Sequence, residues 1–63
     1  MYEEKVIRII TAAIGVIKRG EKSPADTNAG KMLNQLKTMN MPMYEDLLEK
    51  YKAAVESYNM KNA

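Results

Sequence analysis

The first segment of the chain, residues 2–19, is apolar around most of its circumference when it is drawn as a helix. Its polar or small residues step by four, three, four and three and trace one narrow stripe: Glu4, Arg8, Thr11, Gly15 and Lys18. A helix this apolar is usually buried on more than one side. This segment constrains the fold most, because it needs at least two neighbours to cover it.

The same segment has a rival interpretation as two short strands, 6–10 and 14–17. Seven of the twelve Val, Ile and Leu residues of the chain lie here, and all seven are β-branched, as strands favour. However, Thr11-Ala12-Ala13 makes a poor hairpin loop, and a lone hairpin is marginally stable in water. Because the helical period fits the pattern better than alternation does, we predict a helix.

Two turn signals divide the rest of the chain. Gly20 suits the C-terminus of the first helix. Ser23, Pro24 and Asp26 then suit the N-terminus of a second, with Ser23 as the cap and Asp26 at the capping-box position. This second helix is predicted over 24–39, with an apolar face at helical spacing that consists of Ala25, Ala29, Met32, Leu33, Leu36 and Met39.

A third helix is predicted over 42–59, after the break at Asn40-Met41-Pro42. One stripe along it is apolar or aromatic: Tyr44, Leu47, Leu48, Tyr51, Ala54, Val55 and Tyr58. Residues 60–63 are expected to form a frayed tail. The predicted fold class is therefore all-α, with 1–63 as a single small domain. It is either a small helical bundle or a helical hairpin completed by homodimerisation.

Self-association is predicted because a chain of 63 residues builds only a small core. Disulfides, metals and oligomerisation are the usual aids to such a core, and the sequence has neither Cys nor His. The polar stripe of the first helix is also too narrow for a three-helix monomer. We predict a homodimer or higher oligomer centred on that helix, through Val6, Ile9, Ile10, Ala13, Ile14 and Ile17.

The composition argues against an enzyme, and no catalytic, cofactor or metal residue is predicted. The lack of Cys and His excludes thiolate and imidazole chemistry. Glu45, Asp46 and Glu49 are the best acids for metal or acid–base work, but acids near a helix N-terminus ordinarily complement its dipole.

The longest uncharged run near the N-terminus, 9–17, is far shorter than the roughly 20 residues that cross a bilayer. A cytoplasmic protein without a membrane span is expected.

The function that these features favour is that of a small non-enzymatic interaction protein. It would act as an inhibitor, adaptor or regulator of another protein, a profile that small proteins of phages and mobile elements share. Methionine adapts to irregular surfaces, and tyrosine is enriched at interfaces. The predicted partner-binding residues are Met39, Met41, Met43, Tyr44, Tyr51 and Tyr58. The three tyrosines repeat every seven residues on one side of the third helix, and this spacing is also that of residues packed in a core.

Two alternatives remain open. A helical dimer that binds nucleic acid would use Lys18, Arg19, Asn28, Lys31 and Gln35, which are types that reach phosphates and base edges. The net charge is only +2, and the acid Asp26 lies at the N-terminal end of the second helix, which would enter the groove of the nucleic acid. Both features count against this alternative. The second alternative is an oligomer that sequesters a small ligand in an interface pocket lined by Tyr and Lys.

Overall fold

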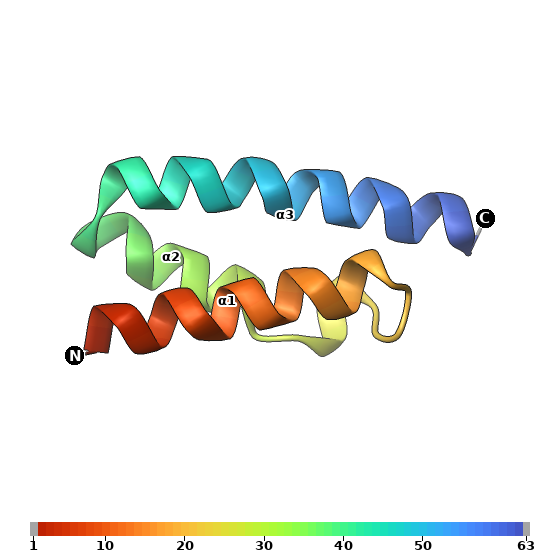
Figure 1. Ribbon diagram of the computed structural model, residues 1–63, viewed down its shortest axis with the longest axis horizontal. Helices are drawn as coiled ribbons and strands as arrows, with labels where there is room; N and C mark the ends of the chain where they lie inside the picture. Colours follow the sequence, from red (N-terminus) through yellow and green to blue (C-terminus); the bar gives the residue numbers. More distant parts are fainter. Residues whose placement is uncertain (1, 63) are drawn as a thin grey trace.

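The computed structural model describes residues 2–62, and this part of the chain is helical with no strand (Figure 1). Helix α1 spans Tyr2–Lys18, the 3₁₀ turn η1 spans Pro24–Asp26, α2 spans Ala29–Met39 and α3 spans Met41–Lys61. The predicted all-α class with three helices is confirmed. The strand interpretation of the first segment is wrong, because α1 runs unbroken through it.

The three helices form an up-down-up bundle in which each helix contacts the other two. Helices α1 and α3 point the same way, and the shorter α2 runs in the opposite direction to both (Figure 1). The chain measures 36 × 17 × 14 Å. Since α2 has 11 residues and α3 has 21, α2 lies against only part of the α1–α3 pair.

The core consists of two clusters along this pair. The larger cluster joins all three helices through Val6, Ile10, Leu33, Leu36 and Leu47. The smaller one, nearer the C-terminal end of α1, holds Ile17, Ala29 and Ala54. Ile10 and Ile17 have no exposed surface, and burying such a side chain contributes about 1.5–3 kcal/mol.

Helix α1 ends in a Schellman motif. Gly20 has a φ of 79°, which glycine adopts without steric cost. Its N–H donates to the Ile17 carbonyl at 2.9 Å, and the Glu21 N–H donates to the Val16 carbonyl at 3.1 Å. The expectation that Gly20 ends the first helix is confirmed.

The second helix begins later than predicted. Pro24–Asp26 form one 3₁₀ turn, Thr27 is extended with φ −116° and ψ 164°, and α2 starts at Ala29. The predicted cap at Ser23 is wrong, because its side chain makes no capping hydrogen bond. Instead, the Thr27 hydroxyl and N–H both donate to the Pro24 carbonyl, at 2.9 and 3.2 Å. These local bonds close the turn and stop the helix.

Helix α3 is longer than predicted at both ends. The Asn40 side chain accepts a hydrogen bond from the Met43 N–H at 3.1 Å and so caps the helix, which starts at Met41. At the other end the helix includes Met60 and Lys61, which belong to the predicted tail 60–63. Residue 63, the last of that tail, lies outside the described residues.

Candidate interaction surfaces

The apolar side of α1 is covered largely within one chain. Val6, Ile10 and Ile17 are buried by α2 and α3, whereas Ile9, Ala13 and Ile14 are half-buried. Two helices packed on α1 account for the narrow polar stripe that predicted an oligomer. Dimerisation through this set stays a prediction, and only the half-buried members lie where a second chain can touch them.

A groove of about 280 Å³ runs between α1 and α3. We call the surface around it the α1–α3 face, because the residues that line the groove come from these two helices: Ile14, Lys18, Lys50, Ala53, Ala54 and Ser57. Ile14 is half-buried and Ala54 is buried, so they form an apolar floor. Lys18 and Lys50 are exposed at the rim, one on each helix.

A second hollow, of about 420 Å³, lies farther toward the N-terminus of α1. It is lined by Glu4, Ile7, Arg8 and Thr11. Ile7 and Ile14 are seven residues apart and therefore lie on the same side of the helix. The second hollow thus follows the groove along α1 and extends the α1–α3 face by about two turns.

A third hollow, of about 260 Å³, lies between α1 and the connection to α2. Its α1 side is apolar, with Ala12, Ala13 and Val16, and its loop side is polar, with Lys22, Asp26, Thr27 and Asn28. Here α1 is already flanked by the loop that leads to α2. This surface has less continuous apolar area than the α1–α3 face.

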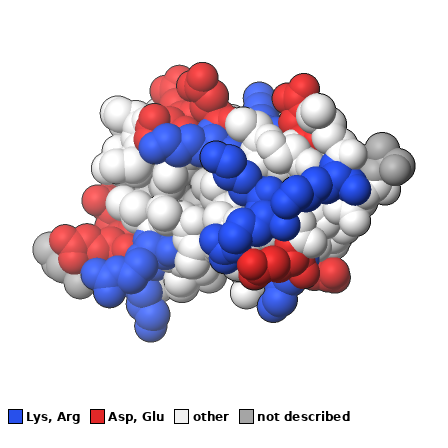
Figure 2. Space-filling view, turned by 45° about the vertical axis from the view of Figure 1, so that its right-hand side comes forward, with Lys and Arg blue, Asp and Glu red and all other residues white. Residues whose placement is uncertain are grey.

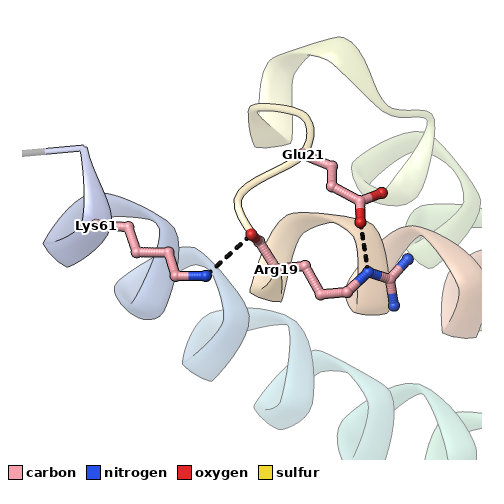
Figure 3. A network of polar contacts seen from close by, with 3 residues as sticks. All are labelled: Arg19, Glu21 and Lys61. Carbon is pink, nitrogen blue, oxygen red and sulfur yellow. Dashed lines mark hydrogen bonds and ion pairs between the residues drawn. The ribbon is translucent and has the colours of Figure 1, made fainter.

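Polar contacts tie α3 to the end of α1 (Figure 3). The Lys61 ammonium donates to the Arg19 carbonyl at 3.0 Å, which satisfies an end carbonyl of α1 and places a cation at the negative end of its dipole. Arg19 Nε donates to Glu21 at 2.7 Å. This contact raises the pKa of Arg19 and, with a smaller effect from Lys61, lowers the pKa of Glu21.

Basic side chains gather at this end of the bundle. Figure 2 shows a band of Lys and Arg across the side of the molecule that it displays, with acidic side chains at the margins of the band. Lys18 and Lys50 flank the groove, and Lys61 reaches Arg19 from the end of α3. Sequence reasoning missed Lys50 and Lys61 as part of this surface, because each is far from Lys18 in the chain and only the packing of α3 along α1 brings them near.

The residues of the nucleic-acid hypothesis do not gather on one helix. Lys18 and Arg19 are exposed at the end of α1, while Asn28 and Lys31 are exposed around the start of α2. Gln35 is half-buried, and its side-chain oxygen accepts a hydrogen bond from the Tyr2 hydroxyl at 2.6 Å. The predicted set is thus divided between the end of α1 and the N-terminal part of α2.

Five of the six predicted partner-binding residues pack against the core. Tyr44 and Tyr51 pack against the larger core cluster, and Tyr51 and Tyr58 pack against the smaller one. The Lys37 ammonium lies 5.8 Å from the centre of the Tyr44 ring, within cation–π range. Of the three methionines, Met39 and Met43 pack on the core and Met41 is 46% exposed. Apart from Met41, these side chains are half-buried, so each keeps part of its surface exposed, and binding through this set stays a prediction.

Residues 2–62 contain no group of three or more acidic residues placed to hold a metal ion. None of the helices in this range is both long and apolar enough to cross a membrane.

Comparison of the chain with family models, curated proteins and solved structures found no match.

Proposed function

We propose that this chain is a small non-enzymatic interaction protein that binds other protein chains, copies of itself included, through the α1–α3 face. The observation that supports this is the groove with its apolar floor of Ile14 and Ala54 and its rim of Lys18 and Lys50. Protein interfaces share this plan, with an apolar centre inside a polar rim. The role of inhibitor, adaptor or regulator and the cytoplasmic location belong to the proposal.

The shape of the groove favours a helix as its occupant. Ala53 and Ser57 are one turn apart on α3, and both are small. Small residues at this spacing let a neighbouring helix approach closely. A helix laid between α1 and α3 would form the fourth member of a bundle, which is a recurring mode of recognition.

The test places a charge in the groove. Ala53 is exposed, so Ala53→Glu should fold normally and yet put a carboxylate where the partner must pack. Ala12→Glu is the matched control, because Ala12 is also an exposed helical alanine but lines the hollow on the loop side. In affinity capture from a host lysate, Ala53→Glu should lose a partner that Ala12→Glu retains. Equal capture by both variants, with equal melting temperatures, would refute the proposal.

A second candidate, nucleic-acid binding, is favoured by one observation, the basic band in Figure 2. If the band binds phosphates, affinity for a fluorescent duplex or single strand falls steeply between about 50 and 200 mM salt. Lys18→Ala and Lys50→Ala would each weaken binding and lessen the salt dependence. No binding at the lower salt concentration would eliminate this candidate.

A further inference from the structure

We infer that a second copy of this chain docks on the α1–α3 face with the two α1 helices antiparallel, so that Glu4 of each copy lies opposite Lys18 of the other. The inference rests on the proposed function, since it names one occupant of the same face. It goes further because it specifies the direction of the partner helix and the charge pairs that set it.

The spacing of residues on this side of α1 has a coiled-coil period. Glu4, Ile7, Thr11, Ile14 and Lys18 follow one another at steps of three, four, three and four. Such a seam faces a partner helix along its whole length. The seam also complements itself when it is turned about its middle residue, Thr11. The acid Glu4 lies at one end and the base Lys18 at the other, and one isoleucine lies between Thr11 and each end.

The side chains of the seam are available for this contact. Ile7 and Ile14 are half-buried against the core, so part of each remains on the surface. The exposed Thr11 donates its hydroxyl to the Ile7 carbonyl at 2.8 Å. Because that hydrogen bond satisfies the donor, Thr11 can present its methyl group to a neighbour without leaving the hydroxyl unpaired.

The charges at the ends of the seam have no ionic partner among residues 2–62 of their own chain. Within residues 2–62 the ion pairs are Arg19–Glu21 and Lys50–Asp46, which leaves Glu4 and Lys18 unpaired. An antiparallel second α1, turned about Thr11, brings its acidic first turn to the cationic rim of the groove. A parallel arrangement would instead set like charges opposite each other, which is destabilising.

The same charges favour a second copy over an unrelated helix. A two-fold interface needs a surface that complements itself, so each acid must meet a base of the same surface. The seam meets this condition with two equivalent Glu4–Lys18 pairs. A stable interface buries about 800 Å² on each partner. This is about a fifth of the 4420 Å² surface, which one side of a three-helix bundle can supply.

The experiment exchanges the charges. Glu4→Lys places two bases opposite each other at both ends of the interface, and Lys18→Glu places two acids there. In sedimentation velocity at increasing protein concentration, the native chain should dimerise, and each variant alone should stay monomeric. An equimolar mixture of the two variants should form a heterodimer, because every pair across the interface is again one acid with one base.

Two control variants carry the same charge changes away from the face. Glu45→Lys and Lys52→Glu alter exposed residues of α3 that line none of the three hollows, and both should dimerise like the native chain. Recovery of the dimer on mixing also shows that both seam variants are folded. Circular dichroism of each variant alone provides an independent check of folding.

Three results would overturn the inference: a monomeric native chain, seam variants that dimerise unaided, or a mixture that stays monomeric. None of these decides the proposed function, whose test is the loss of a captured partner with Ala53→Glu. Conversely, heterodimer formation together with unchanged capture by Ala53→Glu would support the inference for self-association and refute the binding of other proteins through this face.

Discussion

The turn after α1 should depend on one glycine, and Gly20→Ala tests this. The φ of 79° lies in the left-handed region, which costs an L-residue about 1–2 kcal/mol. An added Cβ would also lie 3.2 Å from Cδ of Lys61, so this side chain must shift and its bond to the Arg19 carbonyl weakens. Alanine restricts the unfolded chain, which offsets about 0.4–1 kcal/mol.

The net loss for Gly20→Ala should be about 1 kcal/mol, or a fall of about 4–8 °C in melting temperature for a domain of this size. The assay is thermal and urea unfolding followed by circular dichroism. Protein concentration must be fixed, since association makes the melting temperature depend on it. This loss is a large share of the roughly 3–5 kcal/mol that so small a core supplies.

Gly30→Ala is the matched control, with the opposite sign. Gly30 lies in α2, and a Cβ there would meet no atom within 4 Å. Alanine is a better helix former, so this variant should gain about 0.5–1 kcal/mol. If Gly20→Ala stabilises the chain as much as Gly30→Ala does, the reasoning from the left-handed turn is wrong.

Three further predictions concern the ends of the helices. Asn40→Ala should lower the free energy of unfolding in urea by about 1 kcal/mol, because it removes the side-chain cap of α3. Asn28→Ala removes no capping bond and should change stability by less than about 0.5 kcal/mol. Equal losses for the two variants would contradict this prediction. Lys61→Ala should cost about 0.3–1 kcal/mol, and salt should shrink the difference; a salt-independent loss would point to lost packing instead. Glu21→Gln should destabilise at neutral pH. Because the folded protein lowers the pKa of Glu21, its carboxylate stabilises the fold above the unfolded pKa, and this contribution disappears as pH falls through the folded pKa. The gap between the two melting curves should close on acidification, and a gap that widened would refute this assignment.

The sequence predicted the end of a helix correctly where the backbone conformation at that point depends on a single residue. Gly20 marked the end of α1 because few other residues adopt its φ without strain. The start of α2 was mispredicted because Ser23, Pro24 and Asp26 match a capping pattern. The Thr27 hydroxyl instead closes a separate turn, and this competition between side-chain and helical hydrogen bonds is not visible in periodicity.

Tertiary packing supplied what the pattern of apolar residues did not contain. The apolar circumference of α1 required two neighbours, and α2 and α3 supply both within one chain. The pattern alone could not separate this from an oligomer. Likewise, Lys61 reaches Arg19 across 42 residues, and the groove exists only because α3 packs along α1. The sequence identified Ile14 and Lys18 as candidates, and the fold placed them on one surface with Lys50.

The most direct test of self-association through the α1–α3 face is the solution mass of the native chain beside Ala53→Glu, measured by light scattering on a sizing column. One chain has a mass of 7.2 kDa. The account predicts a mass approaching twice this value for the native chain as concentration rises, and the mass of a single chain for Ala53→Glu. Equal masses for the two proteins at every concentration would contradict it.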